Sequence, residues 1–423
     1  MTILDEPAGI PPSSLVRRFG PGLITGAADD DPSGIATYSQ VGAQFGYGLA
    51  WTMLFSLPLM IAIQEISGRV GCVTGRGISE NLRRHYSPWL VRVIVLLLLT
   101  ANIINLGADI GAMGAALRLL LGGSALLYTV IFGIACVVAE VFLSYAVYAG
   151  FLKWLTVSLF AYVAVVFAVH VPWDSALLAT FVPHLSLNHD EATALVAILG
   201  TTISPYLFFW QAALEVEERR RNGARPLCLT PHLAPPEFRR IRMDTMFGMG
   251  VSNLIAICII YSTAATLHAT GITDIQTSSQ AAEALRPIAG RLTFVIFAIG
   301  IIGTGLLAVP VLAGSGAYAL SEALRWREGL DQRLRQAKSF YATIAVSTAV
   351  GVSLNFTSLN PVKALYWSAV VNGVLAAPVM AVIMLIAGNG RIMGRLSLPR
   401  PLLAAGWLAT LVMTAASIGF FVL

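Results

Sequence analysis

Three consecutive carboxylates, Asp29, Asp30 and Asp31, stand immediately before Pro32 in an apolar stretch of the chain. A carboxylate inside a bilayer costs at least about 2.5 kcal/mol on insertion scales, so one that is kept there usually has a function. Proline lacks a backbone N–H donor and disfavours helix at the preceding residue. If the stretch crosses a membrane, the sequence predicts a helix break at Asp31, where the carboxylate and freed backbone carbonyls can bind a cation.

A similar interruption occurs in residues 193–215, where the step Ser204–Pro205 follows a glycine and two threonines. Paired interruptions at corresponding places are typical of transporters built from two repeats, which bind their substrate between the breaks. The candidate ligands here are the backbone carbonyls near Thr201 and Thr202 and the Ser204 hydroxyl. Oxygen ligands of this kind suit hard cations such as Mg²⁺, Ca²⁺ or Mn²⁺.

The three carboxylates are not expected to point to one site, because successive helical residues lie about 100° apart. We therefore expect Asp31 to bind the cation and either Asp29 or Asp30 to help. The remaining carboxylate would face a vestibule or pair with a basic or hydroxyl group. The alternative for Asp29 and Asp30 is that they line the cavity without touching the ion.

Other polar residues are candidates for the path of the ion. Asn105 and Asp109 are four residues apart, so they share a helix face and could border a cavity. For Gln211 and Asn372, which also lie in apolar segments, hydrogen bonds between helices are the simpler interpretation. Glu65, near one end of an apolar segment, is predicted either to form a gate or to pair with an arginine.

The composition indicates a polytopic membrane protein, since 57% of the 423 residues are hydrophobic and 12% are charged, with a mean hydropathy of +0.76. Soluble domains carry about 25% charged residues. Eleven apolar runs approach the roughly 20 residues that cross a bilayer. They lie at about 20–45, 47–67, 91–118, 125–147, 154–172, 193–215, 244–268, 290–315, 339–355, 362–387 and 402–422.

These runs predict an all-α fold with 11 transmembrane helices in a single transporter domain, residues 1–423. The paired breaks predict two inverted five-helix repeats, at 20–172 and 193–387, followed by an additional C-terminal helix at 402–422. No large soluble domain fits between the runs.

Basic residues predict the orientation, because Lys and Arg in short loops remain cytoplasmic. If the N-terminus is in the cytoplasm, most basic residues fall in cytoplasmic segments. Those left outside are mainly Arg118, Arg286, Arg291 and Lys363. An odd number of spans then places the C-terminus outside. The net charge of +5 is therefore a signal of topology and does not indicate nucleic-acid binding.

The sequence shows no nucleophile and base at a recognisable spacing, so we expect neither an enzyme nor a resident cofactor. The four cysteines lack the paired spacing of a metal site and are expected to be buried thiols. The predicted outer segment at 171–193 contains His184, His189, Asp190 and Glu191 but no Lys or Arg. This segment is either a solvated acidic loop or a region that gathers cations.

Several stretches resemble Nramp-type divalent metal transporters. GPGLITGAADDDPSGIATYSQVGAQFGYGLAW and ISGRVGCVTGRGISE resemble the first two helices of that family, and the similarity continues through GAALRLLLG, FRRIRMD and NPVKALYWSAVV. The resemblance covers nearly the whole chain. It implies a LeuT-like fold with a metal site between the unwound parts of the first and sixth helices, in which Asp31 matches the aspartate of the family motif Asp-Pro-Gly-Asn.

The chain departs from the family at positions that bear on the choice of ion. Gly34 stands in place of the asparagine, and Ser204 and Tyr206 stand in place of the methionine and histidine of a Met-Pro-His motif. Thr201 matches the position that donates a carbonyl. Without the thioether, the site loses a reason to prefer softer transition metals over Mg²⁺. These changes resemble the Nramp-related magnesium transporters, a branch thought to carry a hydrated or partly hydrated ion.

The departures also concern proton coupling. Gln211 stands in place of a second family histidine, and the third-helix acids of the family fall near Ala108 and Gly111, with Asp109 displaced by one position. Histidine is the side chain that titrates near neutral pH, so its loss argues against proton coupling.

We therefore expect a secondary transporter of a divalent cation, Mg²⁺ or Mn²⁺, that works by alternating access as a monomer in the cell inner membrane. The lipid bilayer and the ion are its expected partners. One alternative is a transporter of an organic cation or an amino acid on the same fold. Another is a non-transporting membrane sensor, which would be expected to carry a soluble signalling domain.

Overall fold

The structure is a computed structural model that describes residues 21–142, 156–186, 188–330, 332–357 and 360–423. Within these ranges the chain forms helices, turns and loops and no strand, as the apolar runs predict. The helices are α1 (Pro21–Asp29), α2 (Pro32–Phe45), α3 (Trp51–Thr74), α4 (Ile78–His85), α5 (Pro88–Leu121), α6 (Ala125–Phe142), α8 (Phe160–Ala168), α9 (Trp173–Phe181), α10 (His189–Thr202), α11 (Pro205–Arg221), α12 (Ala234–Thr266), α13 (Ser278–Glu283), α14 (Arg286–Ala289), α15 (Thr293–Leu324), α16 (Lys338–Leu354), α17 (Pro361–Ala387), α18 (Gly390–Met393) and α19 (Arg400–Val422).

Both predicted helix breaks are present. α1 ends at Asp29 and α2 begins at Pro32, while α10 ends at Thr202 and α11 begins at Pro205. Each break leaves two residues outside the helices, which is less than the roughly 3.6 residues of a full turn. The breaks are short because each proline is itself the first residue of the next helix, where its missing N–H group is not needed.

Eight helical stretches in the described ranges are long and apolar enough to cross a membrane, with α10 and α11 taken together. The run predicted at 20–45 corresponds to the shorter α1 and α2, and the run at 339–355 corresponds to α16, which has 17 residues. The run at 154–172 lies partly outside the described residues. The chain is a polytopic all-α membrane protein, and its division into eleven spans stays a prediction.

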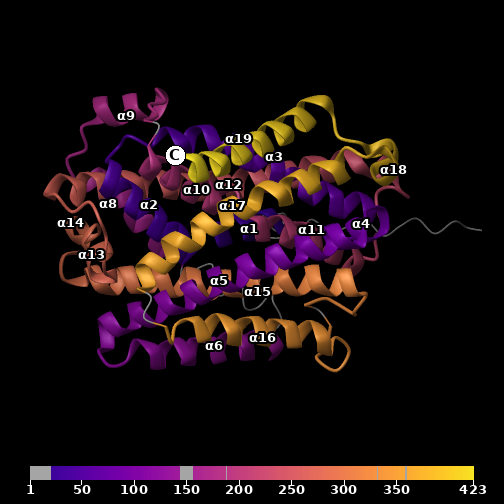
Figure 1. The fold of residues 1–423 in the computed structure, drawn as a ribbon, viewed down its shortest axis with the longest axis horizontal. Coiled ribbons are helices and arrows are strands. Elements are labelled where there is room, and N and C mark those ends of the chain that lie inside the picture. The colour runs from indigo at the N-terminus through magenta and orange to yellow at the C-terminus, as the bar shows by residue number, and fades with distance from the viewer. Residues whose placement is uncertain (1–20, 143–155, 187, 331, 358–359) are drawn as a thin grey trace, which may run out of the picture.

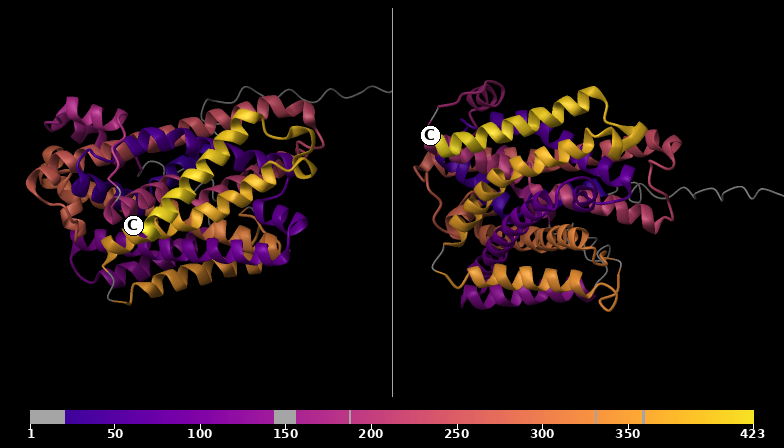
Figure 2. Two further views of the ribbon diagram at one scale, coloured as in Figure 1. Left: turned by 45° about the horizontal axis from the view of Figure 1, so that its top comes forward. Right: turned by 45° about the vertical axis from the view of Figure 1, so that its right-hand side comes forward.

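The long helices pack in layers. α5 and α15 lie side by side through the middle of the molecule, and α6 and α16 pack along one side of them (Figure 1). On the other side α17 crosses α10, and α19 covers α17 and α3 (Figure 2). α12 packs against both α1 and α2. The two interrupted helix pairs therefore lie inside the molecule, surrounded by the longer helices.

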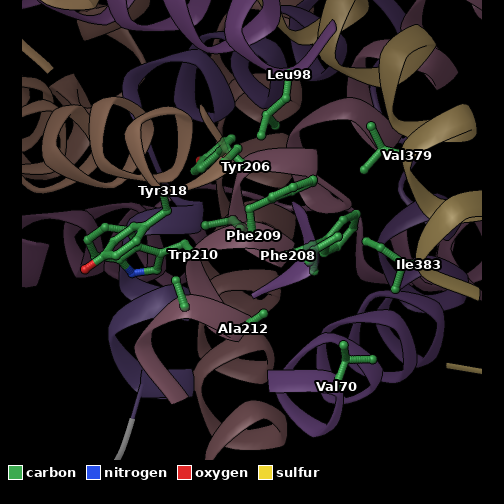
Figure 3. Packing of buried hydrophobic residues seen from close by; sticks show 14 of the residues in the cluster. Val70, Leu98, Tyr206, Phe208, Phe209, Trp210, Ala212, Tyr318, Val379 and Ile383 are labelled. Atoms are coloured by element: carbon green, nitrogen blue, oxygen red, sulfur yellow. The ribbon is translucent and has the colours of Figure 1, made fainter. Parts of the chain in front are cut away.

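The core around α11 is aromatic (Figure 3). Tyr206, Phe208, Phe209 and Trp210 are consecutive or nearly so on this helix, and all four are buried. The Trp210 ring packs edge-on against Tyr318 of α15, with 6.1 Å between the ring centroids. Lipid tails are as apolar as these side chains, so close packing holds such helices together more than transfer from water does. This packing fixes α11 directly after the second break.

Three of the four cysteines are buried, as predicted: Cys72, Cys136 and Cys258. The prediction is wrong for Cys228, which is exposed. Cys228 lies in the connection between α11 and α12, where the chain has left the packed helices.

α10 and α17 cross at two glycines. A Cβ atom on Gly200 would lie 2.1 Å from the Ala369 carbonyl oxygen, and one on Gly373 would lie 2.3 Å from the Val196 carbonyl oxygen. No side chain fits at such distances, so the close approach of the two backbones requires glycine. The crossing holds the end of α10, where the second break begins, against α17.

Gly200→Ala is expected to lower the free energy of unfolding by about 1–3 kcal/mol, because the added methyl group would overlap a backbone oxygen of α17. Thermal unfolding of the purified protein in detergent measures the effect. Gly250→Ala in α12 is the control, since a Cβ there meets no atom within 4 Å. The control should unfold at or slightly above the wild-type temperature; equal losses in both variants would contradict the tight crossing.

Candidate cation site

Asp31 is the buried N-cap of α2. Its Oδ1 atom accepts hydrogen bonds from the Ser33 hydroxyl and the Gly34 amide, both at 2.7 Å. Its Oδ2 atom accepts one from Asn105 Nδ2 at 2.9 Å and one from the Tyr206 hydroxyl at 3.3 Å. Four donors therefore fix the orientation of this carboxylate at the break.

The Tyr206 hydroxyl connects α11 to the first break. It lies 3.2 Å from the Ala28 carbonyl oxygen and 3.3 Å from Asp31 Oδ2. One proton serves two acceptors at long distances, so this is the weakest of the four contacts to Asp31. An ion that approaches Asp31 Oδ2 competes first with the Tyr206 hydroxyl.

The second break approaches the first through Thr201. Thr201 Oγ1 shares a 2.7 Å hydrogen bond with the Tyr38 hydroxyl of α2, and a Cβ on Gly34 would lie 3.3 Å from the same oxygen. The Ser204 hydroxyl donates to the Gly200 and Thr201 carbonyls, both at 2.8 Å, and retains its oxygen as an acceptor. The structure thus brings Thr201 and Gly34 together, and it ties Ser204 and the Thr201 carbonyl to the end of α10.

Asp29 and Asp30 meet at one hydroxyl of α12. Ser252 Oγ lies 2.6 Å from Asp29 Oδ2 and 3.0 Å from Asp30 Oδ1, and both carboxylates are buried. The two side chains do not diverge as helical spacing predicts, because α1 ends at Asp29 and Asp30 is not helical. Both carboxylates therefore pair with a hydroxyl group, which is one of the outcomes predicted for the carboxylate that does not bind the ion.

The three consecutive carboxylates lack cationic partners. Among the described residues, no lysine, arginine or histidine forms an ion pair with Asp29, Asp30 or Asp31. Asp29 Oδ1 has no hydrogen-bond partner either. Buried carboxylates without a counter-ion are costly, so this region of the protein favours the arrival of a positive charge.

Asn105 and Asp109 of α5 face the break together, as their spacing predicts. Asn105 also accepts a hydrogen bond from the Ser368 hydroxyl of α17 at 2.8 Å, so it connects Asp31 to a third helix. Asp109 is fully buried beside Asp31 and the Ser33 amide, and neither of its carboxylate oxygens has a hydrogen bond of regular geometry.

Asn372 follows Ser368 by four residues on the same face of α17 and is buried. Neither its side-chain oxygen nor its nitrogen has a hydrogen-bond partner among the described residues. The interhelical hydrogen bond expected for this residue is therefore missing. A buried amide with no partner is rare in proteins, and its polar atoms are available to a ligand.

Gln211 of α11 forms hydrogen bonds with residues of α1 and α3 and so connects three helices. Its Oε1 atom accepts hydrogen bonds from Thr25 Oγ1 at 2.8 Å and from Gln64 Nε2 at 3.3 Å. Its Nε2 atom donates to Glu215 Oε1 at 3.2 Å. The interhelical hydrogen bonds predicted for Gln211 are thus present, and they hold α1 against α3 and α11.

Further polar contacts connect helices on the side of the molecule that we predict to be cytoplasmic. The Gly22 amide donates to Asp244 Oδ2 at 2.7 Å, which attaches the start of α1 to α12. Glu65 forms ion pairs with Arg69 at 2.5 Å and Arg242 at 3.2 Å. Of the two roles predicted for Glu65, the arginine partner is therefore present.

A cavity of about 430 Å³ opens on the predicted outer side. Residues that line it include Ala36, Gln40, Gln44, His189, Asp190, Thr193, Asp274, Lys363 and Tyr366. Inside it, Lys363 Nζ lies 3.7 Å from Asp274 Oδ2. Ala36 is five residues beyond Asp31, which corresponds to a rise of about 7.5 Å along the helix between the two Cα atoms.

Ser252, Ser368 and Tyr38 belong to this site and were not predicted. Serine in a membrane helix commonly bonds to a carbonyl of its own helix, as Ser262 does with Cys258 and Ile259. Residue type and spacing therefore do not distinguish Ser252 from its neighbours.

Ser252→Ala is expected to lower the free energy of unfolding by about 1–3 kcal/mol, because it removes a donor from two buried carboxylates. Thermal unfolding measures the change. Ser262→Ala is the matched control, since Ser262 is equally buried on α12 and bonds only to carbonyls of its own helix. Equal effects of the two substitutions would show that Ser252 does not support the carboxylates.

The profile of one protein family matches nearly the whole chain. The family is described as Natural resistance-associated macrophage protein-like, or Nramp, and the match covers residues 22–423. The divalent metal cation transporter MntH of Klebsiella pneumoniae (strain 342) is 24% identical over 404 residues, which cover 94% of this chain and 92% of the relative. The protein of the same name from Acidiphilium cryptum (strain JF-5) is 29% identical over 310 residues, covering 70% of this chain and 67% of the relative.

Two solved structures share the arrangement of helices. The crystal structure of the Eremococcus coleocola manganese transporter, in complex with an aromatic bis-isothiourea substituted compound, aligns with a TM-score of 0.73 and 17% identity, covering 97% of this chain and 88% of that one. Mhp1, a nucleobase-cation-symport-1 family transporter, aligns with a TM-score of 0.50 and 15% identity, covering 94% and 91%. At such identities the likeness shows the fold alone, which is the LeuT-like fold that the sequence predicts.

Proposed function

Because this chain belongs to the Nramp family, we propose that it is a secondary transporter that moves a hard divalent metal cation, Mg²⁺ or Mn²⁺, across a bacterial-type inner membrane by alternating access. The names of its relatives, a divalent metal cation transporter and a manganese transporter, support this class of substrate over an enzyme reaction. The observation that carries the proposal is the Asp31 carboxylate, which is buried at a helix break without a cationic partner among the described residues.

Asp31 would bind the ion through Oδ2, where the Tyr206 hydroxyl makes the weakest contact. Asp29 and Asp30 supply further negative charge within the same break, and Asn372 and the Ser204 oxygen supply neutral polar atoms. All of these groups would offer the cation carboxylate, hydroxyl or amide ligands, which suit hard cations. No thioether stands at the second break, so the site lacks a soft ligand that would favour Mn²⁺ over Mg²⁺.

The ion would enter from the outer cavity and leave toward the cytoplasm. Asp190 and Asp274 line that cavity together with one lysine, Lys363, so its lining carries a net negative charge that would attract cations. The N-terminus would be cytoplasmic and the C-terminus outside. A negative cell interior favours inward movement by about 2.3 kcal/mol per elementary charge and 100 mV. The positions of Gln211, Ala108 and Gly111, which carry no titratable group, support transport without proton coupling.

Proteoliposomes that contain the purified protein and an internal pH dye test this proposal. We expect uptake of Mg²⁺ or Mn²⁺ without acidification of the vesicles. Uptake of Mn²⁺ with acidification would replace the uncoupled mechanism with a proton-coupled one. Absence of uptake for both ions would overturn the proposal in favour of an organic substrate or a non-transporting relative.

Asp31→Ala is expected to abolish cation binding and uptake while the protein remains folded, because it removes the carboxylate at the break. Binding is measured by isothermal titration with Mn²⁺ and Mg²⁺, and folding by thermal unfolding. Asp274→Ala is the control, since Asp274 is exposed in the outer cavity and should affect the rate of uptake more than the binding. Unaltered binding by Asp31→Ala would refute the site assignment.

Ser204→Met is expected to shift the ratio of Mn²⁺ to Mg²⁺ affinity toward Mn²⁺ by roughly tenfold, because a thioether is a softer ligand than a hydroxyl. Ser204→Leu has a similar volume without sulfur and controls for the enlarged side chain in this buried position. Competition between the two ions in the uptake assay measures the ratio. The same ratio in both variants would show that Ser204 does not face the ion.

A further inference from the structure

On the side of α10 that packs with α3 and α19, an apolar cavity of about 570 Å³ lies between these three helices. Its lining has no charged residue and only three side-chain hydroxyls, those of Thr52, Ser56 and Ser186. It is larger than the outer cavity and shares no lining residue with it. None of the residues assigned to the cation site reaches it.

The cavity extends from the membrane-facing surface to the interior. Phe55, Leu185 and Leu408 line it and are 46%, 47% and 54% exposed on the surface of the protein. At the inner end lies Leu199, which is buried and directly precedes the Gly200 crossing. Apolar cavities stay free of water, and the medium outside these spanning helices is hydrocarbon. A lipid tail is therefore the occupant whose chemistry matches the lining.

One carboxylate, Glu191, lies beside the lining residue Ser186. Trp51 lines the cavity, and its indole N–H donates to the His184 carbonyl oxygen at 3.3 Å. Tryptophan is enriched at the level of lipid headgroups. The Ser186 amide donates to Glu191 Oε2 at 2.6 Å. The lining contains no Lys or Arg, so Glu191 favours an ammonium group over an anionic headgroup here.

We propose that this cavity binds one acyl chain of a zwitterionic phospholipid that carries an ammonium headgroup, such as phosphatidylethanolamine. The chain packs between α3 and α19 and reaches Leu199, and the headgroup ammonium lies near Glu191. The bound lipid fills the space beside the last turn of α10 and so supports the helix that carries the second break. This assignment does not depend on which ion the protein transports.

Cavity-filling substitutions combined with native mass spectrometry test the proposal. A Cβ on Gly419, which lines the cavity on α19, meets no atom within 4 Å, so Gly419→Leu extends into the cavity without a clash at Cβ. Ala415→Leu fills the same cavity from another position on α19. Ala404→Leu is the control, because Ala404 is exposed on α19 and does not line the cavity.

Each protein is equilibrated with phosphatidylethanolamine and phosphatidylglycerol and washed in detergent before measurement. The wild type and Ala404→Leu should retain one phosphatidylethanolamine, and both cavity-filling variants should retain at least tenfold less while unfolding at the wild-type temperature in lipid-free detergent. Equal retention by all four proteins would overturn the site. Retention of phosphatidylglycerol to the same extent would overturn the assignment of the headgroup.

Discussion

The Asp31 carboxylate is buried where α1 and α2 separate, and its need for hydrogen-bond donors determines what the surrounding helices supply. α2 supplies the Gly34 amide of its first turn, α5 supplies Asn105, and α11 supplies the Tyr206 hydroxyl. A buried charge that lost these donors would cost several kcal/mol. The helices must therefore keep their register, and they do so through backbone contacts such as the one at Gly200, where any side chain would force them apart.

Both halves of the first broken helix pack against α12. α1 approaches α12 so closely that a Cβ on Gly26 would lie 2.3 Å from the Gly248 carbonyl carbon, and hydrogen bonds from Gly22 to Asp244 and from Thr25 to Gln211 attach it as well. A hydrogen bond contributes about 1 kcal/mol net to stability. Close backbone packing and hydrogen bonds together hold α1 against α12 and α11.

The features of the site that could be predicted from the sequence are those set by local chemistry. Proline alone does not mark a break, because Pro58, Pro310 and Pro378 lie inside helices. The breaks before Pro32 and Pro205 could be predicted because polar residues precede each of these prolines, and the four-residue spacing of Asn105 and Asp109 fixes a common face. The meeting of Asp29 and Asp30 at Ser252 could not be predicted, because it depends on how α12 crosses α1. Asn372 was expected to bond between helices, and only the packing of α17 shows that it has no partner among the described residues.

The arrangement around Asp31 also bears on how much of its water the ion keeps. A bare ion that contacted both carboxylate oxygens would have to displace the Ser33 and Gly34 donors, which cap α2, and the loss of an N-cap costs about 1 kcal/mol or more. An ion that approaches Oδ2 alone displaces only the long contact from Tyr206 and can keep waters that bond to Asp29, Asp30 and the neutral groups nearby. Mg²⁺ gives up its waters reluctantly. We infer that selection at this site rests on hydration more than on ligand softness, since the four groups that bond to Asp31 are two hydroxyls and two amides.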